Sequence, residues 1–185
     1  MKKTTLALGL AMASVSAFSQ AAVMLEQGTQ EVSVQGNLNL DYSDDYLLVL
    51  DSSYGYFITD DWEIGGGLGI NMSEHNKRFE FGAFTEYNFT NSTDFVPYVG
   101  AAAQFATLDY KSGHGFDGDW GSEKDDGTNN ALNFKMALGL KYFVNPNVAL
   151  SAEVNYNIAT DDVNVTKDGL EDSFTNIVFG TRFYF

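Results

Sequence analysis

The chain has 185 residues, of which 44% are hydrophobic and 15% aromatic, and it contains no cysteine. Its 25 acidic residues outnumber ten basic ones, which gives a formal net charge of −15 at pH 7. This acidity excludes nucleic acid as a partner, because the phosphates would repel the protein. The lack of cysteine excludes disulfides and thiol-bound metals, and the length predicts one folded domain.

The first 21 residues have the pattern of a secretory signal peptide. Two lysines precede an apolar run that ends at Phe18, and small residues lead to Ala21, after which we expect cleavage. We expect residues 22–30 to form a short periplasmic segment. The exported chain would keep eight basic and 25 acidic residues, a net charge of −17. Beyond the leader no apolar run approaches the 18 or more residues of a membrane-spanning helix.

Alternation of apolar and polar residues predicts β-strands with one apolar face. In the first such segment, Val32 and Val34 alternate with Glu31 and Ser33. The predicted strands cover residues 31–42, 46–58, 62–72, 78–89, 96–109, 132–143, 148–158 and 174–185. These strands of 11 to 14 residues are long enough for a tilted membrane-spanning strand, which needs roughly 9–11 residues.

Short turns and longer polar loops alternate between these strands. The turns are Thr59–Trp62, Thr90–Phe95 and Val144–Asn147, and the loops lie near Ser43 and Ser73 and at Lys111–Thr128 and Asp161–Asp172. Outer-membrane barrels have short periplasmic turns and longer outside loops. The sequence therefore predicts an all-β fold, an eight-stranded antiparallel up-and-down transmembrane β-barrel over residues 31–185, in the cell outer membrane.

The polar face of the predicted strands carries many charges. The expected lumen charge network consists of Glu31, Glu63, Arg78, Glu80, Glu86, Lys135, Lys141, Glu153 and Arg182. A barrel of eight strands is only wide enough for side chains to fill, and buried charges must be paired or hydrated. We therefore expect ion pairs and water to plug the lumen. A narrow conductive or gated path is the alternative.

The last strand places Ile177, Phe179, Phe183 and Phe185 on one face. This strand, together with GYFITDDWEIGGGLG (Gly55–Gly69) and VPYVGAAAQF (Val96–Phe105), resembles small Gram-negative outer-membrane β-barrels. These include OmpX-like proteins and the membrane domain of OmpA-like ones. The resemblance implies that the four residues of the last strand form the signal that the barrel-assembly machinery reads during biogenesis.

Aromatic residues cluster beside the predicted periplasmic turns, as expected for an interfacial girdle. They are Trp62, Tyr87, Phe89 and Tyr142, with Phe143 beside them. We expect them to contact outer-membrane lipid, with lipopolysaccharide as a second partner of the barrel.

The sequence favours a non-enzymatic, monomeric barrel with a structural or surface-interaction role through its acidic outer loops. We expect no catalytic residues, no cofactor and no metal site, since the loop acids lack the spacing of an EF-hand. One alternative is a porin-like channel or transporter of small or apolar solutes. Another is a rim-active lipid-modifying enzyme, in which His75 or His114 would meet a serine. Bridging of loop carboxylates to lipopolysaccharide phosphates by Ca²⁺ or Mg²⁺ is a further hypothesis.

Overall fold

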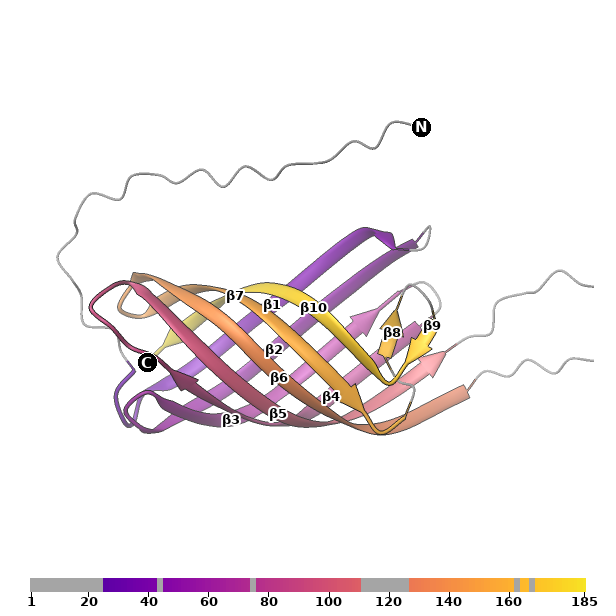
Figure 1. Cartoon of the computed structure of the whole chain (residues 1–185), viewed down its shortest axis with the longest axis horizontal. Helices are drawn as coiled ribbons and strands as arrows, with labels where there is room; N and C mark the ends of the chain where they lie inside the picture. Colours follow the sequence, from indigo (N-terminus) through magenta and orange to yellow (C-terminus); the bar gives the residue numbers. More distant parts are fainter. Residues whose placement is uncertain (1–24, 43–44, 74–75, 111–126, 162–163, 167–168) are drawn as a thin grey trace, which may run out of the picture.

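The computed structural model describes residues 25–42, 45–73, 76–110, 127–161, 164–166 and 169–185. Eight strands of this part form a closed antiparallel barrel, and two short strands pair separately (Figure 1). Within the described ranges, no helix is long and apolar enough to cross a membrane. The predicted signal peptide, His75, His114 and most of the predicted loop at Lys111–Thr128 lie outside the described residues.

The barrel strands follow one another around the wall in chain order, and the last closes on the first. They are β1 (Gln30–Tyr42), β2 (Asp45–Thr59), β3 (Trp62–Met72), β4 (Asn76–Asn88), β5 (Phe95–Tyr110), β6 (Gly127–Asn145), β7 (Val148–Ala159) and β10 (Ser173–Tyr184). The predicted eight-stranded up-and-down barrel is confirmed. The short turns lie at one end of the barrel, which we call the turn end; the opposite end is the loop end (Figure 1).

Part of the predicted loop at Asp161–Asp172 is a small hairpin instead. Its strands are β8 (Asn164–Thr166) and β9 (Gly169–Glu171), and Val165 pairs with Leu170. Strands of three residues are too short to produce a detectable period of two, so the alternation that revealed the barrel strands could not reveal these.

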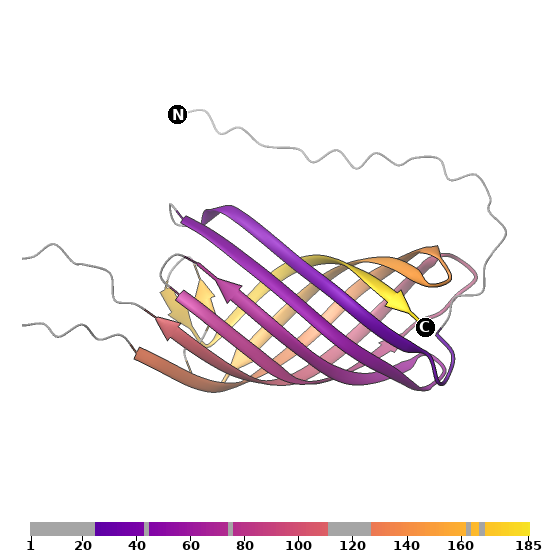
Figure 2. The ribbon, with the colours of Figure 1, turned by 180° about the vertical axis from the view of Figure 1, so that it is seen from behind.

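The first and last strands close the barrel over part of their length only. Their register runs from Glu31 opposite Tyr184 to Gly36 opposite Phe179. Beyond Gly36, the described part of β1 pairs with β2 alone, and the β1–β2 hairpin continues past the closed wall (Figures 1 and 2). The Asn37 side-chain amide donates to the backbone oxygen of Ile177 at 3.1 Å, where the two strands separate.

The outer face of the wall is apolar, as a bilayer requires. Leu68, Phe81 and Leu138 are among the large apolar side chains exposed there. The residues of the predicted assembly signal are also outward: Ile177, Phe179, Phe183 and Phe185 are 50%, 61%, 40% and 67% exposed. The fold thus places them on the surface that lipid or an assembly factor would contact.

An apolar cluster, which we call the plug, closes the lumen at the turn end. It consists of Leu25, Phe57, Val96, Phe143, Ala149 and Tyr184. Leu25 precedes β1, and its carbonyl oxygen accepts a hydrogen bond from the Asp61 amide at 2.8 Å, which holds the segment under the β2–β3 turn. The expectation that Phe143 is interfacial is wrong: it is 4% exposed, because it shares the inward parity of Lys141.

Candidate functional site

Two cations near the turn end of the lumen hold three carboxylates. Lys141 Nζ lies 3.0 Å from Glu31 Oε2 and 2.5 Å from Glu86 Oε1. Arg182 Nη1 lies 2.8 Å from Glu31 Oε1 and 2.9 Å from Glu86 Oε2, and Nη2 lies 3.6 Å from Glu153 Oε2. All five residues are at most 7% exposed. Glu31 and Glu86 each bridge both cations, so the layer ties together four strands from opposite parts of the wall.

Tyr98 completes this layer, although it is not among the predicted lumen residues. Its hydroxyl donates to Glu153 Oε2 at 2.8 Å and accepts from Arg182 Nη2 at 2.8 Å. Its ring centroid lies 4.6 Å from the Arg182 guanidinium carbon and 5.2 Å from Lys141 Nζ, which are cation–π distances. Gly139 lies directly opposite on β6, and a Cβ there would overlap the ring. The glycine therefore makes room for the tyrosine.

A second charged layer lies nearer the loop end. Arg78 Nη2 is 2.5 Å from Glu80 Oε1, and Lys135 Nζ is 3.8 Å from Asp51 Oδ2. The first pair is buried, whereas the side chains of Lys135 and Asp51 keep 16% and 21% of their exposure. A Cβ at Gly69 would lie 2.7 Å from Asp51 Oδ1. This layer therefore also depends on a small inward residue.

A ladder of side-chain amides lines the lumen wall and reaches the first layer. Asn133 donates to Gln104 at 3.3 Å and to Asn157 at 3.0 Å. Asn157 donates to Asn155 at 2.9 Å, and Asn155 donates to Glu153 Oε1 at 3.1 Å. The hydrogen bonds thus run along the wall from Gln104 to the carboxylate that also receives the Tyr98 hydroxyl, and such connected networks rigidify an interior.

A cavity of about 90 Å³ lies among these groups. Its lining includes Gln35, Asp51, Gln104, Lys135, Glu153 and Arg182. A buried water molecule needs at least about 10–15 Å³ measured in this way. The cavity therefore has room for roughly six waters, enough to hydrate the polar groups that the ion pairs leave free.

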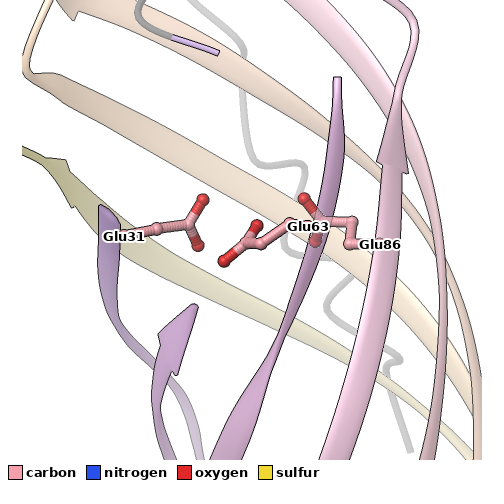
Figure 3. Close-up of side chains that lie close together, drawn as sticks. All are labelled: Glu31, Glu63 and Glu86. Carbon is pink, nitrogen blue, oxygen red and sulfur yellow. The ribbon is translucent and has the colours of Figure 1, made fainter. Parts of the chain in front are cut away.

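Glu63 is the one predicted lumen charge for which the described residues offer neither an ion pair nor a hydrogen bond. It is fully buried, and neither of its carboxylate oxygens has a hydrogen-bond partner. Its oxygens lie beside those of Glu31 and Glu86, with one atom of each within 4.8 Å of the others. Figure 3 shows these three carboxylates directed toward one another inside the barrel.

The predicted lumen residues therefore fall into distinct groups. One group consists of Glu31, Glu86, Lys141, Glu153 and Arg182. Arg78 pairs with Glu80, and Lys135 pairs with Asp51. Glu63 lies beside the carboxylates of the first group. Apart from Glu63, these predicted charges pair with one another or with Asp51.

The predicted interfacial aromatics lie on the outer face at the turn end. Trp62, Tyr87 and Phe89 are 46%, 44% and 48% exposed. Trp62 Nε1 donates to Thr85 Oγ1 at 2.7 Å, and the rings of Tyr87 and Phe89 meet edge to face at 5.2 Å. Tyr142 contributes a ring 4.8 Å from that of Phe95. Amphipathic rings in such a band suit a membrane–water interface.

A family profile described as the outer membrane protein β-barrel domain matches residues 5–185. The chain belongs to this family. Membership in this family places the barrel in the outer membrane, where the apolar face of its wall contacts lipid. Comparison with curated proteins gives no significant match.

Solved structures share the fold of this outer-membrane β-barrel. The N-terminal β-barrel domain of Pseudomonas aeruginosa OprF is 20% identical with a TM-score of 0.60, and the alignment covers 86% of this chain and 98% of that one. Neisserial surface protein A is 19% identical with a TM-score of 0.58, covering 85% and 96%. A de novo designed transmembrane β-barrel is 18% identical with a TM-score of 0.50, covering 86% and 98%. At these identities the likeness concerns the fold alone.

Proposed function

We propose that this outer-membrane β-barrel is a non-conducting, non-enzymatic structural element that carries its acidic outer segments at the cell surface for interaction. The proposal rests on one observation: side chains fill the part of the lumen near the turn end. The apolar plug and the layer of Lys141 and Arg182 lie one behind the other along the barrel. An ion would have to displace both, and a buried charge that is left without its partner costs about 3–5 kcal/mol.

The cavity supports a structural role over transport. Pockets that hold drug-sized ligands measure about 300–1,000 Å³, whereas this cavity has about 90 Å³. Its lining includes Lys135 and Asp51, whose side chains keep part of their exposure, and an apolar solute would remove the water from these charged groups, which is costly. Water is therefore the occupant that the lumen suits best.

The test is deletion of the gene in its host followed by complementation. We expect the deletion to sensitise the envelope to detergent, and both the full chain and a variant with residues 112–126 replaced by a short turn to restore resistance. Only the full chain should restore binding of cells to surfaces, because the variant lacks the acids of that segment. Slower uptake of small solutes with unchanged detergent resistance would instead identify a transporter.

A further inference from the structure

Glu63 is a buried carboxylate without a partner at the centre of an acidic group. It is 0% exposed, and both Oε1 and Oε2 lack hydrogen bonds. One carboxylate oxygen of Glu31 and one of Glu86 lie within 4.8 Å of a Glu63 oxygen. A carboxylate in this state is costly, because burial removes its water and nothing replaces it.

The strand register explains why these three side chains meet. Glu63 and Glu86 are directly opposite on β3 and β4, a position where like charges destabilise a sheet. Glu31 on β1 is opposite Gly55 on β2. A Cβ at Gly55 would overlap the Glu63 carboxylate, so the glycine lets Glu63 extend over β2 toward Glu31. Figure 3 shows the resulting group between β1 and β4.

The charge balance differs between the two layers of the lumen. Nearer the loop end, Arg78 and Lys135 are matched by Glu80 and Asp51. Near the turn end, Lys141 and Arg182 face four described carboxylates, those of Glu31, Glu63, Glu86 and Glu153. The layer therefore carries two surplus negative charges when all of these groups are ionised. A divalent cation would supply the compensating charge.

We propose that Glu31, Glu63 and Glu86 bind one structural Ca²⁺ ion inside the barrel. The donors are all carboxylate oxygens, which hard divalent cations prefer, at about 2.3–2.6 Å for Ca²⁺. Oxygens on opposite sides of such an ion are about 4.6–5.2 Å apart, so one ion reaches atoms that lie within 4.8 Å of one another. Ca²⁺ fits better than Mg²⁺ because it tolerates irregular geometry and bidentate carboxylates.

The ion would complete the layer that closes the lumen. It gives the Glu63 oxygens a partner. Lys141 and Arg182 stay on Glu31 and Glu86, because each carboxylate oxygen can accept more than one contact. The site is sealed below by the plug, so we expect the ion to enter during folding and to exchange slowly afterwards.

The first experiment refolds the full chain into detergent micelles with excess Ca²⁺ or with a chelator, and then passes it over a chelating resin. We expect one Ca²⁺ per chain to survive the resin, because loosely held ions on the outer acids are removed. At free Ca²⁺ one hundred times the dissociation constant, the melting midpoint should rise by about 5–10 °C. A chain that retains no Ca²⁺ and melts identically with and without it would overturn the proposal.

Matched variants locate the effect. Glu63→Gln should lose the retained ion and the Ca²⁺-dependent rise, and in chelator it should melt no lower than the unmodified chain, because the carboxyl that it replaces has no hydrogen-bond partner. Glu80→Gln removes a carboxylate from the balanced layer and should keep the Ca²⁺ response. An equal response in Glu63→Gln would assign the ion to the outer acids and contradict the site. If that variant does not fold, the resin measurement on the unmodified chain decides.

Discussion

Replacing Arg182 with methionine should lower the free energy of unfolding by about 3–5 kcal/mol. The guanidinium contacts Glu31, Glu86 and Glu153 and donates to the Tyr98 hydroxyl. Methionine fills part of the volume but leaves these buried carboxylates with Lys141 as their remaining cation. The loss can be measured by denaturant unfolding of the barrel in detergent, followed by tryptophan fluorescence.

Lys135→Met is the matched control for Arg182→Met. Lys135 also points into the lumen, but its ion pair with Asp51 is 3.8 Å long and both side chains are partly exposed. Its removal should cost about 1 kcal/mol or less. Equal losses in the two variants would mean that the layer near the turn end has no special share in stability.

Gly139→Val should destabilise the barrel by about 2–4 kcal/mol, through overpacking and through the loss of two hydrogen bonds. The added side chain would occupy the position of the Tyr98 ring, so the tyrosine must move away from Arg182 and Glu153. A fall in the denaturant midpoint with an unchanged slope would report the loss.

Gly66→Val controls for the introduction of a β-branched residue. Gly66 is exposed on the outer face of β3, where the nearest atom to an added Cβ is the Gly82 carbonyl oxygen at 3.6 Å. Valine there has room and adds apolar surface toward lipid, so stability should fall by less than about 0.5 kcal/mol. If Gly66→Val is as harmful as Gly139→Val, the close contact with Tyr98 is not the cause.

The parity of the strands predicted much of this structure, because a period of two assigns each side chain to one face. It placed Glu31, Lys141 and Arg182 inside without any knowledge of their contacts. The same parity assigns Tyr98 to the lumen, because it lies two residues before the inward Gly100. Parity alone would therefore have added Tyr98 to the predicted lumen residues. Parity also contradicts an interfacial Phe143, where the aromatic character of the residue was misleading.

Other features depend on distances that alternation does not contain. The isolation of Glu63 follows from the stagger of β1 to β4 and from Gly55, which only the register reveals. Leu25 enters the lumen from a segment without periodicity, and its burial depends on the shape of the turn end. The pairing of β1 with β10 ends at Gly36, and this end point depends on how the strands are staggered around the barrel, which alternation does not reveal.

The plug and the layer of Lys141 and Arg182 together close the lumen at the turn end. The most direct test is single-channel conductance of the refolded chain in a planar bilayer at low and high salt. We expect silence under both conditions, since an ion would have to displace the plug and break the pairs of Lys141 and Arg182. Discrete, steady openings that change when Lys135 or Glu153 is replaced would contradict it and identify a small channel.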